Sequence, residues 1–150
     1  MSHASLRYHI DAPLDHVWSI AVDCSRIPEW NVSFVEVRDC PDRLDRVGAR
    51  YTGVARVLGR RIEGPWETVH VDPPNRIETR GTGPGGARAT ARIEATAAGD
   101  GTDIAFDFDY ELPGGMFAGV MERLAAGAVE RDLRHSNDNF KALCEATYRQ

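Results

Sequence analysis

The sequence has 150 residues, of which 42% are hydrophobic and 27% are charged, and its formal net charge is −5. This length suits one domain with a sizeable core, and no apolar run reaches the roughly 18 residues that a membrane-spanning helix needs. The negative charge argues against a protein that binds nucleic-acid phosphates. We therefore expect a single domain over residues 1–150, with no nucleic-acid partner and no integral membrane association.

The N-terminus and the cysteines indicate the compartment. The first residues lead into an alternating segment without the apolar stretch of a secretory signal, which predicts a cytoplasmic location. Cys24, Cys40 and Cys144 are odd in number and widely spaced, a pattern of neither a metal pair nor a disulfide framework. We interpret all three as reduced thiols.

The chain opens with the pattern of a half-buried strand. Leu6, Tyr8 and Ile10 alternate with polar residues, and a period of two is typical of a strand with one buried face. Pro13 then suits the first turn of a short helix over 13–23, and Ser25 can cap a second short helix over 25–30. Two small helices are thus expected before the rest of the sheet.

Six further strands follow as a meander. Apolar segments at 32–38, 49–58, 61–71, 76–80, 87–96 and 102–112 are separated by short runs rich in Gly, Pro, Asn and Asp. Such runs are turn signals, and short connections between successive strands favour hairpins. The sequence predicts an antiparallel sheet.

The last two strands of this meander have distinct faces. Each alternates apolar residues with charged or small polar ones, so the acids and arginines of the two strands are expected to meet on a solvent-facing side. The apolar sides consist of Ala87, Ala89, Ala91, Ile93 and Ala95 in one strand and of Ile104, Phe106, Phe108, Tyr110 and Leu112 in the other.

A helical pattern then runs over 116–148, after a Pro-Gly-Gly break. Its apolar residues lie on two sides of the helix, one in each half, so the halves must pack against different surroundings. The first side consists of Phe117, Val120, Met121, Leu124 and Ala128, and the second of Val129, Leu133, Phe140, Leu143 and Cys144.

The small side chains on the inner face of 87–96 leave volume to be filled. Two alternatives are open, because dense packing is the norm in protein interiors. Either the space between sheet and helix remains as a cavity, or aromatic and long side chains fill it, namely Phe106, Phe108, Tyr110, Phe117 and Met121.

Several short motifs, in this order, resemble one known superfamily. They are Ala12-Pro13-x-x-x-Val17-Trp18, Ile27-Pro28-Glu29-Trp30-Asn31, Val47-Gly48-Ala49-Arg50, Asp72-Pro73-Pro74-Asn75-Arg76 and Asn139-Phe140-Lys141-Ala142-Leu143. Together they resemble the polyketide cyclase/dehydrase-like branch of the SRPBCC (START and Bet v 1-like) superfamily. The resemblance implies an α+β helix-grip fold, in which a seven-stranded curved antiparallel sheet surrounds the C-terminal helix. It also implies an internal cavity, but no particular activity, because the superfamily contains cyclases, lipid carriers and receptors.

A glycine-rich segment over 81–86 matches the spacing G-x-G-x-x-G. A dinucleotide site would need a helix directly after this loop to hold the phosphates, whereas an alternating strand follows. We interpret the segment as a flexible hairpin and one lip of the cavity.

The five histidines show no metal-ligand spacing, and we expect neither a metal nor a cofactor. The alternation of Ile62, Gly64, Trp66 and Thr68 extends to His70 and places it on the inner face. There its unperturbed pKa near 6.5 would suit proton transfer, although a solvent-exposed or simply hydrogen-bonded histidine is the alternative. His70 is the best candidate for a catalytic residue.

Aromatic residues with a polar tip are the other candidates for ligand contact. Trp30, Tyr51, Trp66 and Tyr110 belong to this group. Polar residues of the long helix mark where the cavity is expected to end, namely Arg131, Asp132, His135 and Asn139.

The sequence therefore predicts a protein that binds a small hydrophobic or aromatic molecule, such as a polyketide-, sterol- or lipid-like compound. The candidate ligand-binding residues are Trp30, Tyr51, Trp66, His70, Ala89, Ala91, Phe106, Phe108, Tyr110, Phe117 and Met121. One alternative is a polyketide cyclase or dehydratase that uses the same cavity. Another is a protein-interaction module of the co-chaperone type, which would need an exposed apolar patch. A homodimer is left open.

Overall fold

The computed structural model describes residues 1–114 and 119–149. A first strand is followed by two short helices with a 3-10 turn between them, by six more strands and by one long helix. These elements are β1 (Ser2–Ile10), α1 (Leu14–Ala21), the turn Cys24–Arg26, α2 (Ile27–Trp30), β2 (Phe34–Arg38), β3 (Arg50–Val57), β4 (Arg60–Asp72), β5 (Arg76–Thr82), β6 (Arg88–Ala98), β7 (Gly101–Glu111) and α3 (Val120–Tyr148).

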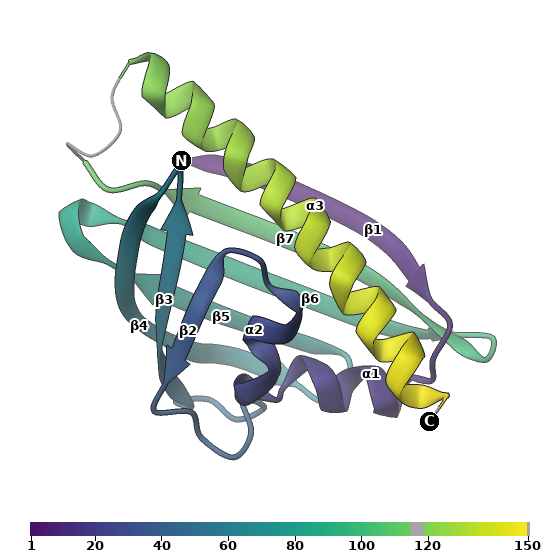
Figure 1. Cartoon of the computed structure of the whole chain (residues 1–150). Helices are drawn as coiled ribbons and strands as arrows, with labels where there is room; N and C mark the ends of the chain where they lie inside the picture. Colours follow the sequence, from purple (N-terminus) through teal and green to yellow (C-terminus); the bar gives the residue numbers. More distant parts are fainter. Residues whose placement is uncertain (115–118, 150) are drawn as a thin grey trace.

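The strands form one 7-stranded antiparallel sheet in the order β1-β7-β6-β5-β4-β3-β2. Strands β2 to β7 lie in sequence order in the sheet. Short turns join β3 to β7 one after another, residues 39–49 connect β2 to β3, and β1 is the edge strand beside β7. The sheet curves, and α3 lies diagonally across its concave side (Figure 1). The helix-grip fold that the resemblance implies is confirmed.

The outer face of the sheet carries the predicted cross-strand charge pairs. Arg92 of β6 donates to Glu78 of β5 at 3.0 Å and to Asp109 of β7 at 2.9 Å. His3 of β1 lies 2.6 Å from the same Asp109 carboxylate. Four neighbouring strands are thus linked by one chain of polar contacts on this side.

The core lies between the concave face, α1 and the second half of α3. Phe140 and Cys144 of α3 are buried against Ile10 and Phe106 of the sheet. The first turns of α3 behave differently, since Val120, Met121 and Leu124 are exposed. Of the two apolar sides expected for the long helix, the second therefore packs on the sheet, while Val120, Met121 and Leu124 of the first project into solvent.

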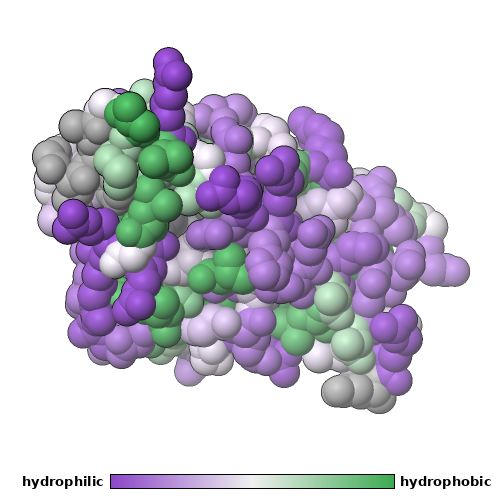
Figure 2. Space-filling model, turned by 45° about the horizontal axis from the view of Figure 1, so that its top comes forward, coloured by the Kyte–Doolittle hydropathy of each residue, from purple (hydrophilic) through white to green (hydrophobic). Residues whose placement is uncertain are grey.

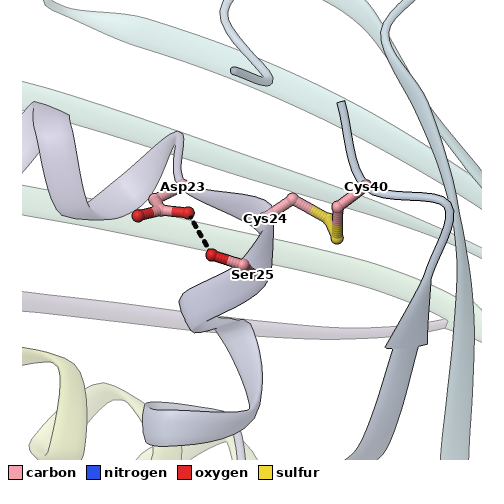
Figure 3. Close-up of a disulfide and its surroundings, with 4 residues drawn as sticks. All are labelled: Asp23, Cys24, Ser25 and Cys40. Carbon is pink, nitrogen blue, oxygen red and sulfur yellow. Dashed lines mark hydrogen bonds between the residues drawn. A yellow bond between two sulfur atoms is a disulfide. The ribbon is translucent and has the colours of Figure 1, made fainter. Parts of the chain in front are cut away.

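Two of the cysteines are bonded, which corrects the prediction of three reduced thiols. Cys24, in the turn before α2, forms a disulfide with Cys40, which follows β2 (Figure 3). The sheet's curvature brings the loop after β2 over the helical segment, so the two Cα atoms lie 5.6 Å apart, a usual spacing for a disulfide. Only Cys144 is a free thiol, and it is buried. Burial raises the pKa of its thiol to about 12.

Within the described residues, no helix has the length and apolar character that crossing a bilayer requires.

Candidate functional site

A cavity of about 190 Å³ lies between the concave face of the sheet and α3. Strands β2 to β7 provide most of its wall, and α2 and the middle of α3 close it. Its lining is dominated by apolar, aromatic and glycine residues, among them Ile27, Trp30, Phe34, Leu44, Tyr51, Gly53, Val57, Ile62, Trp66, Ile77, Gly81, Ala87, Ala89, Ala91, Ile93, Phe106, Phe108, Tyr110, Leu112, Val129 and Leu133.

One wall pairs small residues with a row of rings. Ala91 of β6 lies opposite Phe108 of β7, and Ala89 lies opposite Tyr110. Alternate residues of β7 point the same way, so Phe108 stacks on Phe106 at 6.2 Å and on Tyr110 at 5.5 Å between ring centroids. The alanines leave open space beside these rings.

A second aromatic group lies on strands β2 to β4. Phe34 contacts Trp66 at 5.7 Å and Tyr51 at 6.5 Å between ring centroids, both edge-on. The indole of Trp66 in β4 lies over Gly53 of β3 and Gly81 of β5, and the lack of a side chain at both positions makes room for it. A Cβ added to Gly81 would lie 2.4 Å from this indole, and one added to Gly53 would lie 2.9 Å from it.

Two tyrosines that line the cavity, Tyr51 and Tyr110, are buried. Burial raises the pKa of Tyr51 and of Tyr110, so both phenols stay neutral at ordinary pH. The Tyr110 hydroxyl and the Trp30 indole nitrogen are buried without a hydrogen-bond partner in the part of the chain that the structure describes. The ring of Phe140 packs edge-on against the indole of Trp30, with 5.1 Å between the ring centroids.

Two polar residues of α3 line the cavity, and sequence analysis missed both. Ser136 is 2% exposed and Asn137 is 7% exposed, and both belong to the lining. A signal was present, since they occupy the gap in the apolar stripe formed by Val129, Leu133 and Phe140. Polar residues inside a buried helical stripe need partners. Asn139, expected at the end of the cavity, is not among the lining residues.

The structure corrects the position of His70. A β-bulge between Thr68 and His70 inserts one extra residue in β4, so Thr68 pairs with Thr79 but His70 pairs with Glu78. Because one residue's shift turns every later side chain to the other face, Thr68 is buried while His70 is exposed and absent from the lining.

Of two further predicted ligand contacts, Met121 differs and Phe117 is not tested. Met121 is 42% exposed and is not part of the lining, because it projects from the first turn of α3. Phe117 lies outside the described residues. The other eight candidates, from Trp30 to Tyr110, are brought together around the cavity.

The rim of the cavity includes part of the glycine-rich hairpin. Thr82 and Gly83 belong to the lining, at the turn between β5 and β6. Arg88 and Glu111 stand at the same rim as an ion pair of 2.7 Å. The segment therefore connects β5 to β6 as a hairpin at the edge of the cavity. Its tip, Pro84–Gly86, is a short 3-10 turn, and a β-strand follows it.

An exposed apolar patch lies at the start of α3. Val120, Met121 and Leu124 are 76%, 42% and 54% exposed. Figure 2 shows hydrophobic surface gathered at this end of the molecule, beside the grey residues that precede the helix.

Within the described residues, no group of three or more His, Cys, Asp or Glu side chains is placed to hold a metal ion.

Comparison with known proteins identifies the family. A profile described as "Polyketide cyclase / dehydrase and lipid transport" matches residues 1–145. The chain belongs to this family. The assignment confirms the SRPBCC resemblance and agrees with the helix-grip geometry described above.

Individual relatives are diverse within this family. An uncharacterised Mycobacterium tuberculosis protein is 30% identical over 145 residues, covering 93% of this chain and 98% of the relative. Another M. tuberculosis protein, named as a toxin, is 28% identical over 140 residues, covering 91% of this chain and 95% of the relative. The solved ZhuI aromatase/cyclase of a Streptomyces species has a TM-score of 0.74 at 17% identity, covering 96% of this chain and 93% of that one. At that identity the likeness shows the fold alone.

Proposed function

We propose that the protein binds a small, largely apolar molecule in the cavity between the sheet and α3. The observation that carries this proposal is the cavity lining, where the alanines of β6 leave open space beside the rings of β7. Apolar ligand surface that leaves water for such a lining contributes about 25 cal/mol per Å². The family description, which includes lipid transport, supports the same conclusion.

The volume of the cavity limits the size of the ligand. A dry cavity of roughly 150 Å³ accommodates benzene, and this one measures about 190 Å³. A compact molecule of one or two rings therefore fits without rearrangement. A sterol or a long acyl chain exceeds this volume and would project beyond the cavity.

The lining supports binding better than acid–base catalysis. A general base should have a pKa near the working pH, but burial raises the pKa of both Tyr51 and Tyr110. Arg88 and Glu111 are paired with each other at the rim. No histidine lines the cavity within the described part of the chain.

A cyclase or dehydratase remains the second candidate, because the family description names both activities. His70→Gln tests the version of it drawn from the sequence. Since His70 is exposed on the outer face, we expect the substitution to leave both ligand affinity and any turnover unchanged. A loss of turnover of about 10²-fold, typical of a removed acid or base, would return His70 to the mechanism.

The binding proposal is tested with protein purified from its own cells. Native mass spectrometry should reveal a retained small molecule, and a fluorescence and thermal-shift screen of bicyclic aromatics, fatty acids and sterols should give saturable binding. Compact aromatics are expected to bind more tightly than sterols. Absence of saturable binding across all three classes would contradict the proposal.

The interaction-module alternative depends on the exposed patch of Val120, Met121 and Leu124. Leu124→Glu removes part of this patch without touching the cavity, because Leu124 is not a lining residue. Sedimentation of the wild type and of Leu124→Glu checks whether the patch mediates a homodimer. A monomer in both cases would remove that role for the patch.

The cytoplasmic location stays a prediction. Disulfides persist mainly in oxidising compartments, so the Cys24–Cys40 bond weighs against it.

A further inference from the structure

Asn137 has a buried side-chain amide whose hydrogen bonds are only partly used. Its Oδ1 accepts a hydrogen bond of 2.6 Å from the Tyr8 hydroxyl, and its Nδ2 donates one of 2.8 Å to the Leu133 carbonyl. An amide nitrogen carries two hydrogens. The second has no acceptor among the residues that the structure describes.

The orientation of this amide follows from its neighbours. The Leu133 carbonyl can only accept, so the nitrogen of Asn137 must face it. Burial raises the pKa of Tyr8, which keeps its phenol protonated and able to donate to Oδ1. Both contacts therefore require the same orientation, and the unused N–H belongs to a residue that lines the cavity.

Ser136 presents a second unused donor beside it. Its Oγ accepts a 3.0 Å hydrogen bond from the backbone N–H of Val32. Its own hydroxyl hydrogen has no acceptor among the described residues, although Ser136 is only 2% exposed. Buried donors without acceptors are rare in folded proteins, and here two occur on consecutive residues of the same cavity wall.

We propose that Ser136 and Asn137 bind a neutral hydrogen-bond acceptor of the ligand, of the ketone or other carbonyl type, while its ring lies among the aromatic residues. This inference rests on the proposed function and specifies its ligand class. It places a polar point halfway along α3, opposite a mainly apolar wall in which the Tyr110 hydroxyl also lacks a partner among the described residues. A pure hydrocarbon, which has no hydrogen-bond acceptor, would leave both donors unused.

The charge of the cavity favours a neutral acceptor over a carboxylate. Within the described residues, the cationic side chain in the lining is Arg88, and Glu111 neutralises it at the rim. A buried carboxylate without a cation would bear a large desolvation cost. A ketone oxygen can accept from the Ser136 hydroxyl or the Asn137 amide without needing a cation.

Matched probes test the proposal. Indane and 1-indanone share one bicyclic skeleton and differ by the carbonyl oxygen, and indane-1-carboxylate adds an anion. Dissociation constants are measured for the wild type, Asn137→Leu, Ser136→Ala and the control Asn139→Leu. Asn139 lies on the same helix, donates to the Trp30 carbonyl at 3.3 Å and does not line the cavity.

The ratio of the indane to the 1-indanone dissociation constant is the readout, since it cancels general effects on the cavity. We expect the ratio to fall about three- to tenfold in each lining variant, the usual net effect of one neutral hydrogen bond. It should stay unchanged in Asn139→Leu. The carboxylate should bind more weakly than 1-indanone to the wild type.

A measurement on the wild type avoids dependence on how well the variants fold, since Asn137→Leu also removes the acceptor of Tyr8. The ¹⁵N–¹H signals of the Asn137 side-chain amide should shift with 1-indanone and stay in place with indane.

Binding of both probes with the same ratio in every protein and no amide shift would overturn the proposal while leaving the proposed function intact. Tighter binding of the carboxylate than of the ketone would also overturn it. If no probe binds the wild type, the proposed function fails and this inference fails with it.

Discussion

Ala91 and Ala95 point to the same side of β6 but have different surroundings. Ala91 lines the cavity, whereas Ala95 is 1% exposed inside the packed core and is absent from the lining. Ala91→Leu should therefore abolish ligand binding while leaving the free energy of unfolding unchanged or raised. The matched Ala95→Leu should cost about 1–3 kcal/mol through overpacking.

Denaturant unfolding and ligand titration of both variants check this prediction. The unfolding midpoints can be compared if the free energy of unfolding falls with the same slope against denaturant concentration in each protein. Ala89→Leu provides a second variant on the cavity wall. An equal loss of stability in Ala89→Leu, Ala91→Leu and Ala95→Leu would mean that the space is filled in solution.

Gly81 is needed for the position of Trp66. An added Cβ would lie 2.4 Å from the indole, so Gly81→Ala must displace the ring into the cavity or away from Phe34. We expect a destabilisation of about 1–3 kcal/mol and a changed chemical shift of the Trp66 indole N–H. Gly127→Ala is the control, because its Cβ would meet only a flexible arginine tip, and alanine favours a helix over glycine by about 1 kcal/mol. An unshifted Trp66 signal in Gly81→Ala would contradict the prediction.

At the scale of elements, the Cys24–Cys40 bond joins the segment before α2 to the loop after β2, two segments that help to close the cavity. It spans 16 residues of sequence, and closing a loop of that length stabilises a fold by about 3 kcal/mol on chain-entropy grounds. Cys40→Ser should lower the free energy of unfolding by roughly that amount in oxidising buffer.

A reductant should destabilise the wild type to the same degree and leave Cys40→Ser unaffected. Cys144→Ser should retain the response to reductant, because Cys144 is the free thiol. If reductant shifts neither the unfolding midpoint nor the mass of the native protein, the bond does not form in solution.

The contacts that link β5, β6, β7 and β1 on the outer face predict that the stability of the fold depends on pH. Hydrogen bonds from His3 and Arg92 hold the pKa of Asp109 below its ordinary value. A lowered pKa in the folded state means that the contribution is present above about pH 4, the usual pKa in an unfolded chain, and is lost as pH falls through the folded value.

Asp109→Asn should therefore be less stable than the wild type at pH 7, by about 1 kcal/mol for a partly exposed network. The difference should vanish toward pH 2, where both side chains are neutral. Urea unfolding of both proteins at pH 7 and near pH 2 measures it. A constant difference at both values would show that Asp109 acts through packing rather than through its charge.

At the scale of the whole molecule, an open cavity couples binding to stability. A ligand that binds only the folded state at 100 times its dissociation constant stabilises that state by about 2.7 kcal/mol. We expect the midpoint of thermal unfolding to rise with ligand concentration in the wild type and to stay constant in Ala91→Leu. A rise of equal size in both proteins would place the ligand outside the cavity.

The sequence by itself determined the order of the elements, the faces of β6 and β7 and eight of the residues that line the cavity. These features depend on local periods, turn residues and short motifs, which each segment carries along its own length. The family followed from the same motifs. Even the small residues that open the cavity are visible as the alternating alanines of β6.

Only the tertiary structure decided the position of His70, the Cys24–Cys40 bond and the place of Ser136 and Asn137 in the cavity lining. Strand alternation predicts a side chain's direction until a bulge adds one residue, and the bulge in β4 is defined by its pairing with β5. The disulfide and the unused donors of α3 likewise depend on segments that are distant in sequence and adjacent in space. Contacts of that kind arise from the way the sheet curves around the helix, and a local pattern does not encode that curvature.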